Sequence, residues 1–148
     1  MFVARQLVKH QVGLVWNEES RRYITHDPEI YNIRKWREKP DSSKQGSGEQ
    51  IIISTELNLE VNEHLQQGLS LYNRLLLENV APEQARAILP QSMYTNWIWS
   101  GTLYAFARVC ELRLDEHSQK ETQEIARQLD IHCPVSYTHL RAHETLVH

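Results

Sequence analysis

A short stretch near the start of the chain gathers side chains that suit a phosphate site. This stretch contains cations, amides, an imidazole and hydroxyls within fewer than twenty residues. Its polar residues are Gln6, Lys9, His10, Gln11, Asn17, Glu18, Ser20, Arg22 and Tyr23. An arginine fork binds phosphate oxygens through two parallel hydrogen bonds, and a nearby serine adds a neutral donor. The stretch therefore has the donors that a nucleotide phosphate site needs. A capped helix followed by a surface hairpin with ordinary salt bridges stays open as the alternative.

A second candidate is Arg113, which helical periodicity places on one face with Phe106 and Cys110. A guanidinium that faces inward needs a partner, because burying an unpaired charge costs several kcal/mol. Two explanations stay open: a structural salt bridge with an acid such as Asp115 or Glu83, or a contact with a bound ligand.

The segments that must position these side chains begin with a stretch of nearly helical spacing at residues 2–8. Residues 39–50 read as a polar loop rich in glycine and serine. Residues 51–57 fit either a short strand or a helix lead-in. The clearest helix follows and ends near Asn79, because apolar residues recur every three to four positions at Val61, Leu65, Leu69, Tyr72 and Leu76.

The second half of the chain predicts a short helix, a strand and two further helices. Pro82 suits the first turn of the short helix, and Pro90 closes it. Residues 91–101 read as a strand or extended segment that places Trp97 and Trp99 on one face, in the core or at a subunit interface. A helix is expected over about residues 102–114. Ser118 and Glu121 then predict a capping box for a helix that carries Ile125 and Leu129.

Composition excludes several classes of protein. The chain has 148 residues, enough for one domain, and a net charge of −3, which gives no general attraction to nucleic acid. Charge is uneven, since residues 1–44 carry +3 and the remainder carries −6. Neither a membrane-spanning run nor a signal peptide is recognisable, so we expect a cytoplasmic protein. Cys110 and Cys133 have no metal-binding spacing, and no metal site is predicted.

The end of the chain differs from everything before it. Residues 134–145, PVSYTHLRAHET, resemble one translated frame of a transposon adapter used in sequencing libraries. We therefore expect a domain over residues 1–133 and an artefactual tail over residues 134–148.

The first polar stretch also carries a recognisable motif. Residues 5–23, RQLVKHQVGLVWNEESRRY, resemble the signature of flavin-dependent thymidylate synthases, written R-H-R, a short spacer and N-E-x-S-x-R-Y. Residues 17–23 match the second part fully. In the triad Lys9 and Gln11 replace the two arginines, His10 is kept, and the spacer is one residue longer. Lysine keeps the positive charge but lacks the planar fork of arginine.

A second block is similar to the C-terminal half of the same family. The family pattern there includes E-x-A-R-x-x-L-P, then Y-T, then L-R-x-D-x-x-A-Q-x-E. The matching residues are Glu83, Ala85, Arg86, Leu89, Pro90, Tyr94, Thr95, Leu112, Arg113, Asp115, Gln119 and Glu121. The resemblance covers roughly residues 2–130, and two blocks in the correct order make chance similarity remote.

The resemblance implies a fold and a set of site residues. The expected fold is α+β, a single partial domain in which helices pack on a small sheet. The implied dUMP-binding residues are Gln6, Glu18, Ser20, Arg22, Arg86 and Arg113. The implied FAD-binding residues are Lys9, His10, Gln11, Asn17 and Tyr23. Arg113, which would contact the uracil ring, and Ser20, at the place where a serine nucleophile was once considered, are the candidate catalytic residues.

The implied reaction is the reductive methylation of dUMP to dTMP. The methylene group comes from methylenetetrahydrofolate, NADPH reduces FAD, and hydride from the flavin completes the methyl group. The family implies a homotetramer for the full-length protein, small-molecule substrates, and no nucleic-acid partner. Family members carry a further N-terminal segment with a flavin motif, so we expect this chain to be truncated.

Two alternatives to an enzyme stay open at this point. One is a non-catalytic module that binds nucleotides or single-stranded nucleic acid, with Trp16 and Tyr23 as stacking surfaces. The other is an inactive remnant that forms oligomers but binds nothing.

Overall fold

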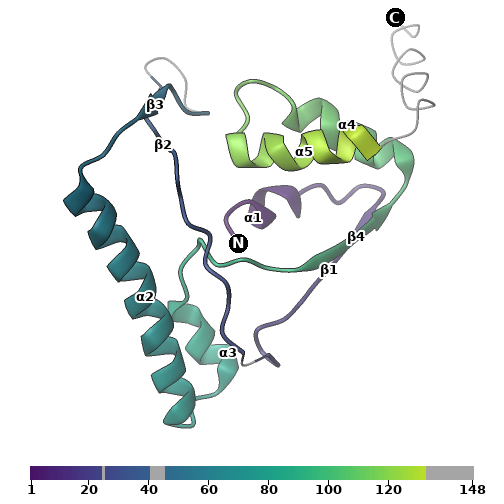
Figure 1. Cartoon of the computed structure of the whole chain (residues 1–148). Coiled ribbons are helices and arrows are strands. Elements are labelled where there is room, and N and C mark those ends of the chain that lie inside the picture. Colours follow the sequence, from purple (N-terminus) through teal and green to yellow (C-terminus); the bar gives the residue numbers. More distant parts are fainter. Residues whose placement is uncertain (25, 41–45, 133–148) are drawn as a thin grey trace, which may run out of the picture. The chain divides into compact units, whose positions relative to one another are not determined.

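The computed structural model describes residues 1–24, 26–40 and 46–132 (Figure 1). They form two compact units that alternate along the chain. The first unit comprises Met1–Ala4, Glu18–Glu38 and Glu49–Trp97, and the second comprises Arg5–Asn17 and the described residues of Lys39–Gly48 and of the chain from Ile98. The expected tail and the domain boundary at residue 133 lie outside the described residues, as does the middle of the expected 39–50 loop.

The first unit is built on α2 (Thr55–Leu77), which confirms the helix predicted from apolar spacing. The hydroxyl of Ser54 accepts a hydrogen bond from the backbone N–H of Leu57 at 3.1 Å and caps the helix start. Beyond the helix end, Asn79 adopts a φ of 63°, as residues after a helix commonly do. The segment at residues 51–57, for which a strand and a helix lead-in were both open, contains parts of both. Its first residue ends β3 (Gln50–Ile51), and its last residues begin α2.

Short elements complete this unit. β3 pairs antiparallel with β2 (Trp36–Arg37). The predicted short helix is confirmed as α3 (Pro82–Ala85), which continues into the 3-10 turn η1 (Arg86–Ile88), and both pack on α2. Met93 forms an isolated antiparallel bridge with Ile30. The side chain of Tyr72 is fully buried and marks the face of α2 that packs inward.

The second unit holds most of α1 (Ala4–Leu7) and most of the sheet formed by β1 (Leu14–Glu18) and β4 (Trp97–Gly101). The strand expected at 91–101 therefore covers only the second half of that range. Trp16 and Trp99 meet edge to face, with ring centroids 5.5 Å apart, and Trp99 meets Phe106 in the same way. This aromatic cluster confirms a packing role for Trp99.

The helices α4 (Leu103–Arg113) and α5 (Lys120–His132) pack on each other in the second unit (Figure 1). The side chain of Thr102 accepts from the N–H of Ala105 at 3.1 Å and caps α4. Cys110 and Ala126 are fully buried between the helices. Helices with two small two-stranded sheets confirm the α+β class.

The predicted capping box before α5 is wrong. The hydroxyl of Ser118 donates to the carbonyl of Leu112 at 3.1 Å, and α5 begins only at Lys120. Ser118 therefore lies one position before the N-cap position of α5, too early to cap the helix start.

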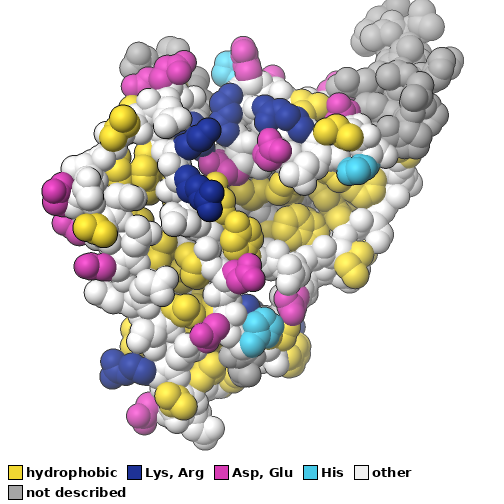
Figure 2. Space-filling view, viewed as in Figure 1, with side chains coloured by type: hydrophobic (Ala, Val, Ile, Leu, Met, Phe, Trp, Pro, Cys, Tyr) yellow, Lys and Arg dark blue, Asp and Glu magenta, His cyan; other side chains and the backbone are white. Residues whose placement is uncertain are grey.

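Apolar side chains reach the surface in several places (Figure 2). Val12, Ile52, Leu77 and Ile98 are among the exposed ones. Within the described residues, no helix is both long and apolar enough to cross a membrane.

Candidate functional site

Arg113, at the C-terminal end of α4, is half-buried and hydrogen-bonded to neutral acceptors. Its Nε donates to Nε2 of His10 at 2.8 Å, and its Nη2 donates to the backbone carbonyl of Gln6 at 3.5 Å. Among the described residues no carboxylate forms an ion pair with it. The structural salt bridge that the sequence left open is therefore not found in this part of the chain.

His10 is held between Arg113 and the aromatic cluster. Its ring centroid lies 6.5 Å from that of Trp99. Because Nε2 accepts the hydrogen bond from an arginine, which is always a donor, the imidazole is neutral and carries its proton on Nδ1. Burial, and secondarily the positive charge of Arg113, hold the pKa of His10 below its ordinary value.

The side chain of Gln6 ties α1 to α5. Its Oε1 accepts from the hydroxyl of Thr122 at 3.3 Å, and its amide nitrogen donates to Oε1 of Gln119. Thr122 is fully buried, and Gln119 in turn donates to Glu121 at 2.9 Å. Gln6 therefore supports the Arg113 region with its backbone carbonyl while its side chain is anchored on another helix.

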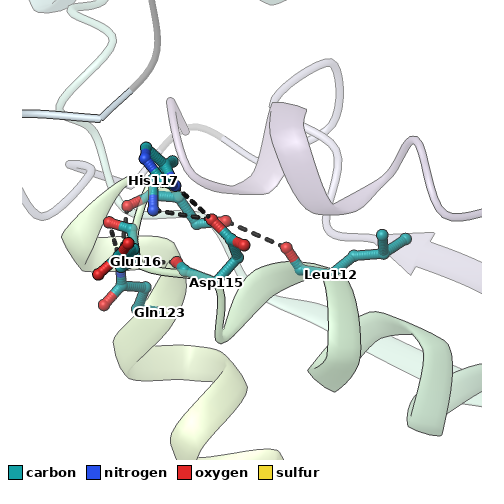
Figure 3. Close-up of polar contacts among 6 residues, drawn as sticks. Leu112, Asp115, Glu116, His117 and Gln123 are labelled. Atoms are coloured by element: carbon teal, nitrogen blue, oxygen red, sulfur yellow. Dashed lines mark hydrogen bonds and ion pairs between the residues drawn. The ribbon is translucent and has the colours of Figure 1, made fainter. Parts of the chain in front are cut away.

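The loop that follows Arg113 is held by one buried side chain, Gln123 (Figure 3). Its amide nitrogen lies within hydrogen-bond distance of three carbonyl oxygens: Asp115 at 3.0 Å, Glu116 at 3.2 Å and Ser118 at 2.8 Å. Its Oε1 accepts from Arg127 at 2.9 Å. The Gln123 amide thus helps to fix the path of the chain between α4 and α5.

Asp115 adds a local cap to the same loop (Figure 3). Its carboxylate accepts from the backbone N–H of His117 at 2.8 Å and lies 3.1 Å from Nδ1 of the His117 ring. The backbone hydrogen bond, followed by the ring contact, lowers the pKa of Asp115. Asp115 is thereby engaged within the loop rather than with Arg113.

Sequence reasoning missed Thr122 and Gln123. A signal for Thr122 was present, because residues 122, 125, 126 and 129 form the inward stripe of α5 and only Thr122 is polar there. Polar residues in such a stripe need buried partners. For Gln123 the sequence alone offers no comparable signal.

A separate polar group lies in the first unit. The hydroxyl oxygen of Ser20 accepts from the backbone N–H of Arg22 at 3.4 Å and from its Nε at 3.2 Å. The Arg22 guanidinium lies 5.2 Å from the centre of the exposed Tyr23 ring. Glu18 accepts from the hydroxyl of Thr95 at 2.5 Å.

Arg86 is an exposed residue of the same unit. Its Nε donates to the carbonyl of Glu83 at 3.3 Å, a contact within one helical turn. The remaining nitrogens of its fork point to no partner within the described residues.

Residues 1–133 match a protein family described as thymidylate synthase complementing protein. The chain belongs to this family. Its relatives include the flavin-dependent thymidylate synthase of Kosmotoga olearia, which is 34% identical over 145 residues. The protein of the same description from Dictyostelium discoideum is 33% identical over 132 residues. These matches cover 93% and 87% of this chain but only 62% and 43% of the relatives, so the chain spans about half of their length.

A solved structure supports the family fold. The chain is similar, with a TM-score of 0.72 and 24% identity, to a UMP/dUMP methylase, PolB, from Streptomyces cacaoi, bound with 5-Br UMP. The similarity covers 88% of this chain and 62% of that one.

The structure sorts the residues implied by the thymidylate synthase motifs into two groups. In the second unit Gln6, His10 and Arg113 are joined by hydrogen bonds. The exposed Lys9, Gln11 and Asn17 belong to the same unit. The remaining implied residues lie in the first unit: Glu18, Ser20, Arg22, Tyr23 and Arg86.

Proposed function

We propose that this chain supplies the uracil-recognition residue, and residues for the nucleotide phosphate, of a flavin-dependent thymidylate synthase acting on dUMP. The bonding of Arg113 carries the proposal. A guanidinium has five N–H donors. Two of them are engaged, with His10 and with the Gln6 carbonyl, and the structure describes no carboxylate partner. The remaining donors suit the carbonyl oxygens of a uracil ring.

Ser20, Arg22 and Arg86 are the residues proposed for the dUMP phosphate. Ser20 uses its oxygen to accept from Arg22, which leaves its hydroxyl hydrogen free to donate to a phosphate oxygen. Arg22 and Arg86 are exposed, and each engages its Nε within the chain, leaving the outer nitrogens of the fork for phosphate. Gln6 and Glu18 act as supporting residues in this proposal.

Ser20 does not need to act as a nucleophile in this chemistry. Nucleophilic serines are activated by an adjacent base. In the described part of the chain the Ser20 hydroxyl is bonded to Arg22, which cannot accept a proton. We therefore propose that Ser20 binds the phosphate, and that Arg113 is the catalytic residue of the pair.

The proposed cofactor is FAD, and the donors present fit its phosphates and polar ring edge. Lys9 offers an ammonium group and Gln11 an amide, both exposed, and Nδ1 of His10 carries a hydrogen that no described residue accepts. Asn17 and Tyr23 complete the proposed set. FAD, when bound, supplies the hydride that completes the methyl group.

Electron balance defines the other proposed partners. Turning the methylene group of methylenetetrahydrofolate into a methyl group needs two electrons. NADPH provides them through FAD, so tetrahydrofolate leaves without being oxidised. We propose that this reaction is carried out by a homotetramer, the assembly that the family resemblance implies.

Calorimetric titration of dUMP into the purified chain, with and without FAD, tests the proposal. We expect saturable binding, and a loss of at least about tenfold in affinity for Arg113→Ala, because a hydrogen bond from a charged donor contributes about 1.5–3 kcal/mol. Arg74→Ala is the matched control, since Arg74 is an exposed arginine in the last turn of α2. Its affinity for dUMP should equal that of the wild type.

Two results would contradict the proposal. A chain that is folded by circular dichroism but binds no dUMP in the presence of FAD would remove the nucleotide site from this polypeptide. Salt-dependent binding of a labelled single-stranded oligonucleotide, without dUMP binding, would favour the non-catalytic binding module instead.

A further inference from the structure

The contact between His10 and Arg113 has a direction. Arginine only donates, so His10 must accept, and it must accept through Nε2. This holds the Arg113 side chain at Nε, the atom from which the rest of the planar fork extends. The Gln6 carbonyl holds Nη2 more loosely, at 3.5 Å. The plane and direction of the outer nitrogens are therefore determined mainly by His10.

We propose that His10 is a positioning residue, which aims the Arg113 fork at the pyrimidine ring only while its imidazole is neutral with the proton on Nδ1. This inference rests on the proposed role of Arg113 in binding dUMP. It assigns to His10 a task that is separate from flavin contact, because Nε2 serves Arg113 and Nδ1 remains for another acceptor.

The surroundings of His10 make its protonation disruptive. The charged group that faces its ring, among the described residues, is Arg113 of α4. β4 contributes the Trp99 ring, which does not titrate, and α1 contributes the carbonyl of Leu7, which accepts from the backbone N–H of His10 at 3.0 Å. Lys9, beside it in the chain, is exposed and cationic. Protonated His10 would place an N–H against the N–H of Arg113, and no carboxylate of the described residues forms an ion pair that would offset the two like charges.

The tautomer can be measured without any ligand. The protein contains eight histidines, and nitrogen-15 spectra of their imidazole rings separate protonated from unprotonated ring nitrogens. We expect one ring in the Nδ1–H form at neutral pH, with its signal removed by His10→Gln. In Arg113→Met this ring should lose that preference, because the donor to Nε2 is gone.

The effect on ligand binding is measured by dUMP affinity at about pH 7.5 and about pH 5.5, on either side of the ordinary histidine pKa. The amide oxygen of His10→Gln can accept from Arg113 at both pH values. The quantity compared is the loss of dUMP affinity between the higher and the lower pH, measured for each protein against itself. We expect this loss to be larger for the wild type than for His10→Gln, by a factor that stays below about ten because the pKa of His10 lies below the ordinary value of about 6.5. Protonation of the dUMP phosphate occurs in the same range, but it affects both proteins equally and cancels in the comparison.

His10→Leu and His64→Gln complete the experiment. His10→Leu cannot accept a hydrogen bond, so it should bind dUMP weakly at both pH values. His64→Gln, an exposed position of α2, should follow the wild type throughout.

The outcomes separate this inference from the proposed function. Parallel pH profiles for the wild type and His10→Gln, with dUMP binding retained, would overturn the positioning role and leave the nucleotide site standing. An Nε2–H tautomer for His10 would overturn the role directly. If the wild type binds no dUMP while His10 shows the Nδ1–H form, the proposed function fails, and with it the nucleotide part of the inference.

Discussion

The hydroxyl of Thr122 donates to the side-chain oxygen of Gln6 at 3.3 Å, although the two residues are 116 positions apart in the sequence. Thr122 is fully buried on α5, and Gln6 lies on α1. The bond matters for the site because the backbone carbonyl of Gln6 accepts from Arg113. A helix with no proposed ligand contact thus steadies the residue that carries the proposed function.

Replacing Thr122 should weaken the second unit. Thr122→Val keeps the shape of the side chain but removes its hydroxyl, so the side-chain oxygen of Gln6 loses this hydrogen-bond donor. We therefore expect the free energy of unfolding to fall by about 1–2 kcal/mol. Thr122→Ser retains the hydroxyl and should lose less. Urea denaturation measures both. Equal losses for the two variants would mean that the methyl group, and not the hydrogen bond, is what matters.

Gln123 should be intolerant of a carboxylate. Gln123→Glu has the same size but replaces the donating nitrogen by an oxygen that faces the carbonyls of Asp115, Glu116 and Ser118. We expect a loss of about 2–3 kcal/mol near neutral pH. The loss should be smaller in mild acid, where the protonated group can donate once. Gln123→Met, which cannot titrate, should show no such recovery in denaturation experiments at the two pH values.

Two glycines should respond in opposite ways to alanine. A Cβ at Gly101 would lie 2.4 Å from the carbonyl oxygen of Gly13, which is a backbone clash, so Gly101→Ala should destabilise the protein by more than about 1 kcal/mol. A Cβ at Gly68, inside α2, would meet only ordinary contacts at 3.7 Å. Gly68→Ala should therefore stabilise the protein by about 0.5–1 kcal/mol. Thermal unfolding of the two variants checks both signs, and stabilisation by Gly101→Ala would show that the close approach is absent.

Acid should destabilise the protein through His10. Its pKa is lower in the folded chain than in the unfolded chain, so above the ordinary value of about 6.5 both states are neutral and no difference arises. As the pH falls through that value, the unfolded chain takes up the proton first, and the free energy of unfolding decreases. The decrease continues until the folded state also protonates.

Comparison of variants isolates this effect from the other histidines. His10→Gln should show a flatter dependence of unfolding free energy on pH just below about 6.5. Asp115, whose pKa is also lowered, acts in the range of ordinary carboxylates and leaves this window unaffected. A wild type and a variant with the same slope would contradict the lowered pKa of His10.

Local patterns were enough to predict several elements of the fold. The spacing from Val61 to Leu76 indicated α2, and Pro82 and Pro90 bracketed the short helix. These predictions succeed because helical periodicity and backbone restrictions act over a few neighbouring residues. The two motif blocks, likewise written in the order of the residues, were enough to indicate the family.

The tertiary structure alone decided how these residues are used. Ser118 has the local pattern of a helix cap, yet α5 begins only at Lys120, and the Ser118 hydroxyl donates to the carbonyl of Leu112 in the preceding helix. Arg113 was expected to need a partner, but only folding shows that this partner, among the described residues, is His10, 103 positions away, and not an acid. Side-chain hydrogen bonds between distant segments depend on which helix faces pack together, and no local spacing contains that information.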